Sequence, residues 1–309
     1  MAANRPAEAI LGAHLADAAA LGLHWLYDPE RIAALKGPIA FRPPDPADYE
    51  GARGVFVHHG RRAGQGSHYG EQMRVMTRAI LAAGEYRTEI YASAFLASFG
   101  PGGSWVGYAD RATRGSVEGI AHGRHPSGAE DDQMPAVVKL PPLIARLRGQ
   151  AWEAVVAEAV AVTSNHPVAL AWAPAAAAAL HAAMAGAGLH AALHAGVRAV
   201  PGRVGQPLHV AMEHARDDPV AFAGRVGRAC AVTEALPVAF QILARAGSFR
   251  EAVLDNIRAG GDSCGRGIFI GAMAAMEWGV TSAPLDWLLK LEDGAAIWAE
   301  AQALAALGG

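Results

Sequence analysis

Long apolar, alanine-rich stretches run along most of the chain and are separated by clusters of glycine and proline. No segment alternates apolar and polar residues convincingly, so the pattern predicts no β-strand. We expect Pro237 to interrupt one helix, because proline lacks the N–H that a helix interior needs. The pattern therefore predicts an all-α globule of roughly a dozen helices. The expected helical segments are residues 6–27, 71–98, 111–121, 136–148, 151–163, 168–186, 188–197, 220–246, 249–258, one that begins at Asp262, and 284–306.

Residues 37–70 break this pattern. The segment contains Pro38, Pro43, Pro44 and Pro46 together with repeated glycines, which exclude a continuous helix. A loop of this length in a compact protein is typically a lid, a binding loop or a disordered segment. We therefore expect a single domain over residues 1–309, with residues 37–70 as a long loop over a cleft.

Composition narrows the class of protein. Of the 309 residues, 52% are hydrophobic and only 7% aromatic, and the many alanines favour helix. The net charge of -3 provides no basic surface for nucleic acid. Two cysteines, Cys230 and Cys264, are too few for a disulfide framework, so we expect a cytoplasmic protein. Neither a signal peptide nor a membrane span is expected from the pattern.

The first helical segment contains an unexpected polar stripe. His14, Asp17, His24 and Asp28 fall within an arc of roughly 80° if each residue turns a helix by 100°. Buried polar groups need partners, because an unpaired buried carboxylate is costly. The stripe is either a set of structural, internally paired residues or the wall of a site in which Asp17 orients its neighbours and His24 faces a ligand.

Residues 66–73 leave the long loop and enter a helix. Ser67 and its neighbours are candidates for an N-cap, and in the simplest interpretation the segment does nothing else. The alternative is a ligand-facing loop that suits a phosphate or a sugar hydroxyl. Its candidate residues are His58, His59, Arg61, Arg62, His68 and Tyr69.

Two shorter polar segments are weaker candidates. His166, between Asn165 and Pro167, is either a site residue or a turn feature. The run from Glu130 to Gln133 contains three acids and is typical of a solvated helix start.

The densest chemistry lies in Gly260-Gly261-Asp262-Ser263-Cys264-Gly265-Arg266-Gly267. Asp262 or Ser263 can cap the following helix, whose exposed N–H groups favour an anion. Arg266 could bind a phosphate or carboxylate, and the helix start would favour the thiolate of Cys264. An ordinary helix cap explains the same residues. The segment is no dinucleotide fingerprint, because no strand precedes it.

Taken together, these segments resemble the ADP-ribosylglycohydrolase family. The resemblance is carried by residues 229–237, Phe249 to Val253 and Gly260 to Asp262. Gly12 with Asp17-Ala18 is similar to the family's opening segment, and Thr163 to Pro167 to its short Ser/Thr-His motif. The resemblance covers nearly the whole chain. It implies an all-α fold and a cleft that binds ADP-ribose or a similar molecule.

The chain departs from the family where its hydrolases bind two magnesium or manganese ions. The family motif Thr-Asp-Asp-Thr-Gln-Met is replaced by residues 68–73, in which only Gln72 and Met73 match. The motif Gly-Asp-Thr-Asp-Thr is replaced by residues 261–265, in which Asp262 is the one remaining carboxylate and Ser263 a conservative exchange. Hard divalent ions prefer several oxygen ligands, so we assign no metal ligands and no cofactor, although Mg²⁺ is expected for the family.

His24 stands where the resemblance implies a further carboxylate. The residues from Ala18 to Asp28 and from Asp262 to Arg266 resemble a branch that includes J-type crystallins. Four functions remain open: a glycosidic hydrolase without the metal pair, a binding protein that has lost catalysis, an enzyme with Cys264 as nucleophile, and a crystallin-like structural protein. The expected partner is a nucleotide sugar or an ADP-ribosylated substrate, with no nucleic acid and no membrane.

The candidate site residues fall into two groups. The catalytic candidates are Asp17, His24, Asp262 and Cys264. The substrate-binding candidates are His68, Tyr69, Gln72, Asp132, His166, Ser263 and Arg266.

Overall fold

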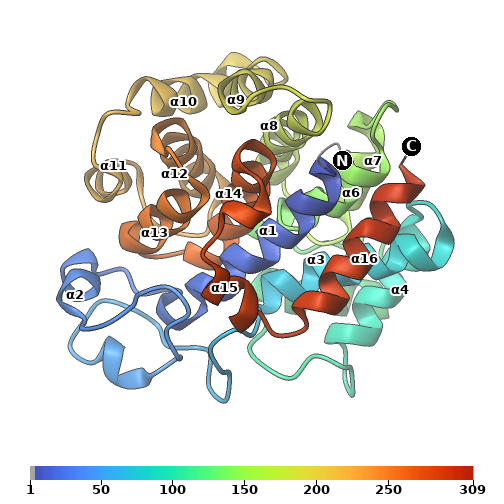
Figure 1. The fold of residues 1–309 in the computed structure, drawn as a ribbon. Helices are drawn as coiled ribbons and strands as arrows, with labels where there is room; N and C mark the ends of the chain where they lie inside the picture. The colour runs from blue at the N-terminus through green and yellow to red at the C-terminus, as the bar shows by residue number, and fades with distance from the viewer. Residues whose placement is uncertain (1–3, 309) are drawn as a thin grey trace.

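The computed structural model describes residues 4–308, which form sixteen α-helices and four short 3₁₀ helices without a strand in that range (Figure 1). The all-α prediction is confirmed. The helices are α1 (Arg5–Ala20), α2 (Pro29–Ala34), α3 (His68–Ala83), α4 (Thr88–Phe99), α5 (Arg111–Ala121), α6 (Leu140–Arg146), α7 (Glu153–Ala161), α8 (Pro167–Met184), α9 (Leu189–Arg198), α10 (Gly202–Glu213), α11 (Pro219–Val226), α12 (Val232–Arg245), α13 (Phe249–Ala259), α14 (Ser263–Trp278), α15 (Leu285–Lys290) and α16 (Gly294–Leu307).

Several expected boundaries are wrong. The first helix ends at Ala20, and a 3₁₀ turn over Leu21–Leu23 follows before the chain becomes extended at His24. Residues 71–98 form two helices because Gly84 adopts a left-handed conformation with φ of 76° and ends α3. The last predicted segment likewise divides into α15 and α16. The pattern missed the short helix α2 and the whole of α10.

The segment 220–246 is broken at Gly227 rather than at Pro237. Gly227 has φ of 126°, and a Cβ there would overlap the carboxylate of Glu234. That carboxylate accepts a hydrogen bond from the N–H of Ala229 at 2.8 Å, which holds the turn between α11 and α12. Pro237 lies inside α12, where the helix tolerates the loss of one N–H.

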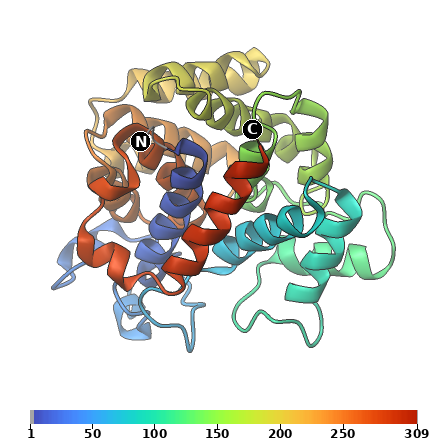
Figure 2. The same cartoon turned by 45° about the vertical axis from the view of Figure 1, so that its right-hand side comes forward.

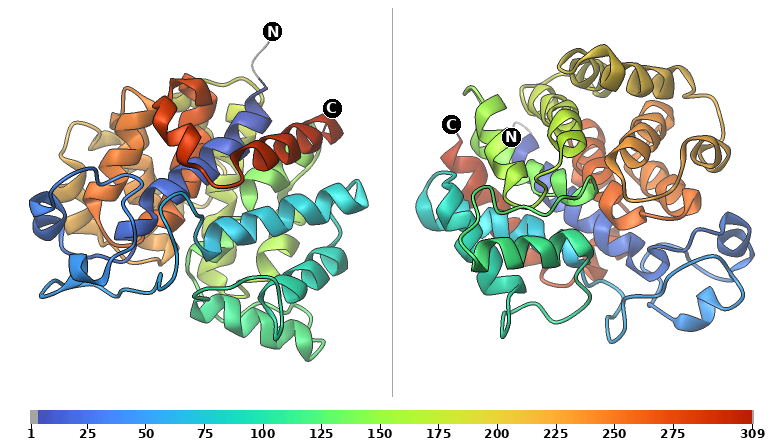
Figure 3. Two further views of the ribbon diagram at one scale, coloured as in Figure 1. Left: turned by 60° about the horizontal axis from the view of Figure 1, so that its bottom comes forward. Right: turned by 180° about the vertical axis from the view of Figure 1, so that it is seen from behind.

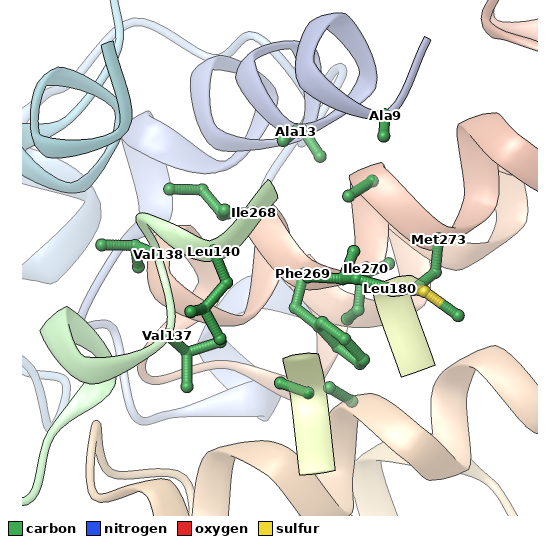
Figure 4. Packing of buried hydrophobic residues seen from close by; sticks show 14 of the residues in the cluster. Ala9, Ala13, Val137, Val138, Leu140, Leu180, Ile268, Phe269, Ile270 and Met273 are labelled. Atoms are coloured by element: carbon green, nitrogen blue, oxygen red, sulfur yellow. The ribbon is translucent and has the colours of Figure 1, made fainter. Parts of the chain in front are cut away.

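Helix α1 lies at the centre of the molecule, against α14 and α16 (Figures 1 and 2). Glycines allow the backbones of α1 and α14 to touch, because a Cβ on Gly12 would overlap Gly271 and a Cβ on Gly271 would overlap the carbonyl of Gly12. Figure 4 shows small side chains of α1, Ala9 and Ala13, over the larger apolar side chains of α14 and its neighbours. This contact joins the helix that carries Asp17 to the helix that carries Ser263, Cys264 and Arg266.

The long segment before α3 lies at one end of the molecule, away from α8, α9 and α10 (Figures 1 and 3). It contains a 3₁₀ turn over Pro46–Tyr49. The predicted loop ends slightly early, because Ser67 caps α3 and the helix begins at His68.

Helix α8 is long and apolar enough to cross a membrane by length and composition, but 61% of it is buried. It packs against α6, α7, α9 and α12. A core helix passes the same test, so the absence of a membrane span stays a prediction.

A lysine is buried in the core at the start of α6. Lys139 is fully buried, and its Nζ donates to the carbonyl of Pro135 and to Thr163 Oγ1. Burial lowers its pKa from 10.5 to about 7, because the charged ammonium is poorly solvated there. An unfolded chain binds that proton more tightly, so the folded state loses stability as the pH falls from the unfolded value toward 7.

Replacing Lys139 with methionine is expected to stabilise the protein near neutral pH. Thr163 Oγ1 still donates to the Pro135 carbonyl at 3.1 Å, so both groups keep one hydrogen bond after the change. Each unit of pKa shift corresponds to about 1.4 kcal/mol, so we expect the melting temperature to rise by several degrees at about pH 7 and by much less at about pH 10. Lys290→Met, at a half-exposed lysine, is the control and should lack this pH-dependent gain. A lower melting temperature for Lys139→Met at pH 7 would refute the argument.

Gly271→Ala should destabilise the protein, although alanine ordinarily stabilises a helix by about 1 kcal/mol relative to glycine. The new methyl group would overlap the Gly12 carbonyl and separate α1 from α14, which we expect to cost about 1–3 kcal/mol in the free energy of unfolding. Gly202→Ala is the matched control, because a Cβ there meets nothing within 4 Å. Chemical denaturation measures both, and equal stability of the two variants would contradict the close contact.

Candidate functional site

Polar side chains from four separate segments meet in the interior, where α3, α5 and α14 begin and the chain leaves α1. No member is more than 2% exposed. We call this group the central cluster, and it consists of Asp17, His24, His58, Ser67, His68, Tyr69, Asp110, Asp262, Ser263 and Cys264.

Asp17 fixes the start of α3. Its two carboxylate oxygens accept hydrogen bonds from the backbone N–H of Ser67 at 2.8 Å and from Ser67 Oγ at 2.6 Å. A Cβ on Gly70 would overlap the same carboxylate, so the residue in the first turn of α3 has to be small. Burial raises the pKa of Asp17, and the hydrogen bonds from Ser67 oppose that shift. Asp17 thus positions Ser67 at the start of α3.

His24 is a neutral hydrogen-bond donor. Its Nδ1 accepts the backbone N–H of Cys264 at 3.2 Å, so the ring proton resides on Nε2. Nε2 is buried and has no hydrogen-bond partner in the described structure. Burial lowers the pKa of His24 well below its usual value, and the nearby His58 and His68 add to the shift.

Asp262 is a carboxyl group held at the start of α14 without a hydrogen bond to either oxygen from residues 4–308. Its Oδ1 lies 3.7 Å from His24 Nδ1. Burial raises its pKa to about 6, although Arg266 and His68 favour the charged form. A buried carboxyl group with this pKa can exchange a proton near neutral pH.

The glycine pair before Asp262 explains its placement. Gly260 and Gly261 have φ of 72° and 69°, and a Cβ on Gly261 would overlap the backbone of Arg228. The N–H of Gly261 donates to the carbonyl of Leu26 at 2.7 Å, and the N–H of Trp25 donates to the carbonyl of Gly261 at 2.8 Å. The turn is therefore locked against the segment that carries His24.

His68 and Asp110 form a pair that sequence reasoning missed. His68 Nε2 lies 3.4 Å from Asp110 Oδ2, while Asp110 Oδ1 caps α5 by accepting the N–H of Thr113 at 2.7 Å. Burial raises the pKa of Asp110, but His68 and Thr113 more than offset that effect and leave it below its usual value. The one signal in the sequence was the position of Asp110 directly before the predicted helix 111–121. That position indicates a helix cap and gives no sign of a pair with His68.

Aromatic rings cover the cluster. Trp25, with φ of 64°, lies 4.9 Å from the His24 ring and 5.4 Å from Tyr108, measured between ring centroids. Tyr69 packs on His68 at 3.9 Å, and His58 approaches His24 at 5.3 Å. Neither Trp25 nor Tyr108 was predicted, because nothing in their sequence positions indicates burial over polar groups.

The prediction about the thiol at the start of α14 is wrong. The pKa of the Cys264 thiol is raised well above its usual value, first by burial and then by Asp17 and Asp262, so the helix start does not favour the thiolate. Arg266 is fully buried and donates to Asn256 Oδ1 at 3.0 Å and to the carbonyl of Asn256 at 3.2 Å and that of Gly260 at 2.5 Å. Its guanidinium therefore braces the glycine turn, while its Nη1 is buried without a hydrogen-bond partner in the described structure. The predicted contact of Arg266 with a phosphate stays a prediction.

Other candidates lie outside the cluster. Asp28 caps α2 through the N–H of Arg31 at 2.9 Å, and His166 caps α8 through the N–H of Val168 at 3.2 Å. The expected polar stripe is thus divided, because α1 ends before His24. The main-chain carbonyl of Asp132 accepts the N–H of Val232 at 2.9 Å. His59 is exposed on the loop.

Gln72 is fully buried beside the cluster, and Ser263 is fully buried within it. Gln72 Nε2 donates to Thr113 Oγ1 at 2.9 Å, which ties α3 to α5. Ser263 Oγ has no partner in the described part of the chain.

His14 and Arg61 line a separate polar cavity of about 330 Å³ behind Ser67. The guanidinium of Arg61 lies 4.7 Å from the ring of Trp105, and Arg62 pairs with Glu292 at 3.1 Å. Of the expected ligand-facing loop, His58, His68 and Tyr69 enter the central cluster.

The resemblance implies a pair of metal ions, which the His, Cys, Asp and Glu side chains of the site would have to bind. Among residues 4–308, no three His, Cys, Asp or Glu side chains come together as metal ligands. The proton on His24 Nε2 prevents that atom from coordinating a cation. Glu71 is the one acid in residues 68–73, which replace the family's first motif. Its carboxylate accepts a hydrogen bond from Ser98 Oγ at 3.1 Å. These residues do not fit two hard divalent ions.

Comparison with known proteins agrees with the resemblance. A solved structure titled "ADP-ribosylglycohydrolase-related protein complex" aligns with a TM-score of 0.77 and 20% sequence identity, over 99% of this chain and 98% of that one. At this identity the match establishes the fold alone. The curated proteins give no match. The model of the family described as ADP-ribosylglycohydrolase matches residues 2–309. The chain therefore belongs to the ADP-ribosylglycohydrolase family.

Proposed function

We propose that this protein hydrolyses a glycosidic bond of an ADP-ribose-like or related substrate, and that the central cluster does so without a metal pair. The observation that carries the proposal is Asp262, a buried carboxyl group with both oxygens unpartnered among residues 4–308 and a pKa of about 6. Family membership supports a glycohydrolase-like activity. Two free, buried cysteines support a cytoplasmic location.

In the proposed reaction Asp262 is the general acid. A carboxylic acid whose pKa is raised by burial can protonate the leaving group as the glycosidic bond breaks. The N–H at His24 Nε2 donates a hydrogen bond to a substrate oxygen. His68 accepts the proton of the attacking water, whose oxygen forms the new bond at the anomeric carbon. One proton is thus delivered and one removed, as hydrolysis requires.

The burial of the site favours a second candidate, a catalytically degenerate ligand-binding or crystallin-like structural protein. Every member of the cluster is at most 2% exposed under Trp25 and Tyr108, so a substrate enters only if this cover moves. The two candidates differ in turnover. If Trp25 and Tyr108 stay in place, no substrate reaches the central cluster and it is a structural core.

The first test is release of free ADP-ribose or its analogue from ADP-ribosylated substrates, followed by chromatography. Because the donor set does not fit a metal pair, we expect turnover to change less than about twofold on adding EDTA or millimolar magnesium. Calorimetry should detect binding of ADP-ribose to the protein and should detect no tight binding of magnesium. Loss of turnover in EDTA would refute the metal-free mechanism. Binding without turnover would favour the second candidate.

Asp262→Asn should lower kcat by roughly 10²–10⁴-fold, because the amide cannot donate a proton to the leaving group. In the wild type, kcat/KM should fall as the pH rises above about 6, where Asp262 ionises. Because the folded state raises the pKa of Asp262, the wild type loses stability as the pH rises from 3.8 to about 6. The Asp262→Asn variant has no such carboxyl group, so its melting temperature at neutral pH should be no lower than that of the wild type.

Glu130→Gln, at an exposed acid, is the matched control and should leave both kcat and the melting temperature unchanged. An Asp262→Asn enzyme that retains wild-type turnover would show that another group supplies the proton.

A further inference from the structure

We propose that Asp110 is the positioning residue for His68 and fixes which ring nitrogen of His68 carries the proton. The assignment rests on the proposed function for its catalytic meaning, but the structural claim can be tested separately. Asp110 Oδ2 lies 3.4 Å from His68 Nε2. Both residues are at most 1% exposed, and neither Oδ2 nor Nε2 has another hydrogen-bond partner in the described structure.

The backbone fixes Asp110 from one side. It is the N-cap of α5, where Oδ1 accepts the N–H of Thr113 at 2.7 Å. Thr113 Oγ1 in turn accepts from Gln72 Nε2 at 2.9 Å, so the start of α5 is tied to α3, the helix that begins with His68. With Oδ1 committed to the cap, Oδ2 is the oxygen that faces the imidazole.

This geometry decides the tautomer of His68. A carboxylate accepts hydrogen bonds only, so the ring places its proton on Nε2 and faces Asp110 with an N–H donor. Nδ1 is then left as a lone pair, and it too is buried without a partner among residues 4–308. The proposed reaction needs that lone pair, because a protonated Nδ1 could not accept the proton of water.

Other polar groups approach His68 from the other side of the cluster. Asp262 stands at the start of α14, and His24 and His58 approach across the cluster, with His24 and His68 ring centroids 6.4 Å apart. Among residues 4–308, Asp110 is the one carboxylate that lies within 4.0 Å of a ring nitrogen of His68.

The substitution Asp110→Asn tests this proposal. Its first readout is the NMR spectrum of protein labelled with ¹⁵N-histidine. Asparagine also caps helices, and its oxygen remains with the Thr113 N–H, so its NH₂ group faces His68. His68 Nε2 must then become an acceptor, and the proton should move to Nδ1. We expect the ¹⁵N shifts of His68 to report an Nε2–H tautomer in the wild type and an Nδ1–H tautomer in the variant.

The kinetic expectation for the same variant is a fall in kcat of roughly 10²–10⁴-fold with little change in KM, because the wrong tautomer cannot act as base. The melting temperature should stay close to that of the wild type. Asp110→Ala should lose the cap as well and melt lower, by about 1 kcal/mol in stability. This contrast separates positioning of His68 from support of α5.

Asp218→Asn is the matched control, because Asp218 caps α11 through the N–H of Ala221 at 3.1 Å on an exposed surface. It should change neither the tautomer of His68 nor kcat. An unchanged His68 tautomer in Asp110→Asn would overturn the proposal. So would unchanged kcat in an active enzyme. If the wild type shows no hydrolysis, the proposed function fails, and the NMR result still decides the role of Asp110.

Discussion

The backbone contact between α1 and α14 is the constraint on which the site depends. Gly12 and Gly271 let the two helices touch, and no side chain can be added at either position without moving one helix. The contact sets the depth at which α14 begins, so that the Cys264 thiol donates to the carbonyl of Asp17 at 3.5 Å and the Cys264 N–H reaches His24. Packing of small residues thus determines where the polar chemistry is placed.

Burial then gives those polar groups their character. An unsatisfied buried donor or acceptor costs about 1–3 kcal/mol, and the central cluster contains several, including both oxygens of Asp262, Nε2 of His24 and Nδ1 of His68. The packing of the surrounding helices offsets this unfavourable free energy. In return the burial raises the pKa of Asp262 toward neutrality and keeps His24 uncharged. A buried polar cluster that leaves several groups without partners is typical of a site that binds a ligand.

The sequence could predict the all-α class, the helix that contains Asp17 and the importance of the turn before Asp262, because these follow from local composition and short motifs. It could not predict the pair of His68 and Asp110, whose members are separated by the helices α3 and α4. Nor could it predict the raised pKa of the Cys264 thiol or the hydrogen bonds of Arg266 within the glycine turn. A helix start favours a thiolate only when solvent or ligand reaches it, and full burial reverses that expectation.

The departures from the family motif are coupled to one another through Asp17. The motif that the resemblance supplies has acids where this chain has Tyr69 and Gly70. Position 70 abuts the carboxylate of Asp17, where a Cβ would collide and a second negative charge would be repelled. Tyr69 instead fills its position with a ring packed on His68, which is itself held by Asp110. Once Asp17 is committed to Ser67, neutral and aromatic groups suit this pocket better than a cluster of metal-binding carboxylates. The same exchange that removes oxygen ligands for a divalent ion supplies, in His68, a group able to accept a proton.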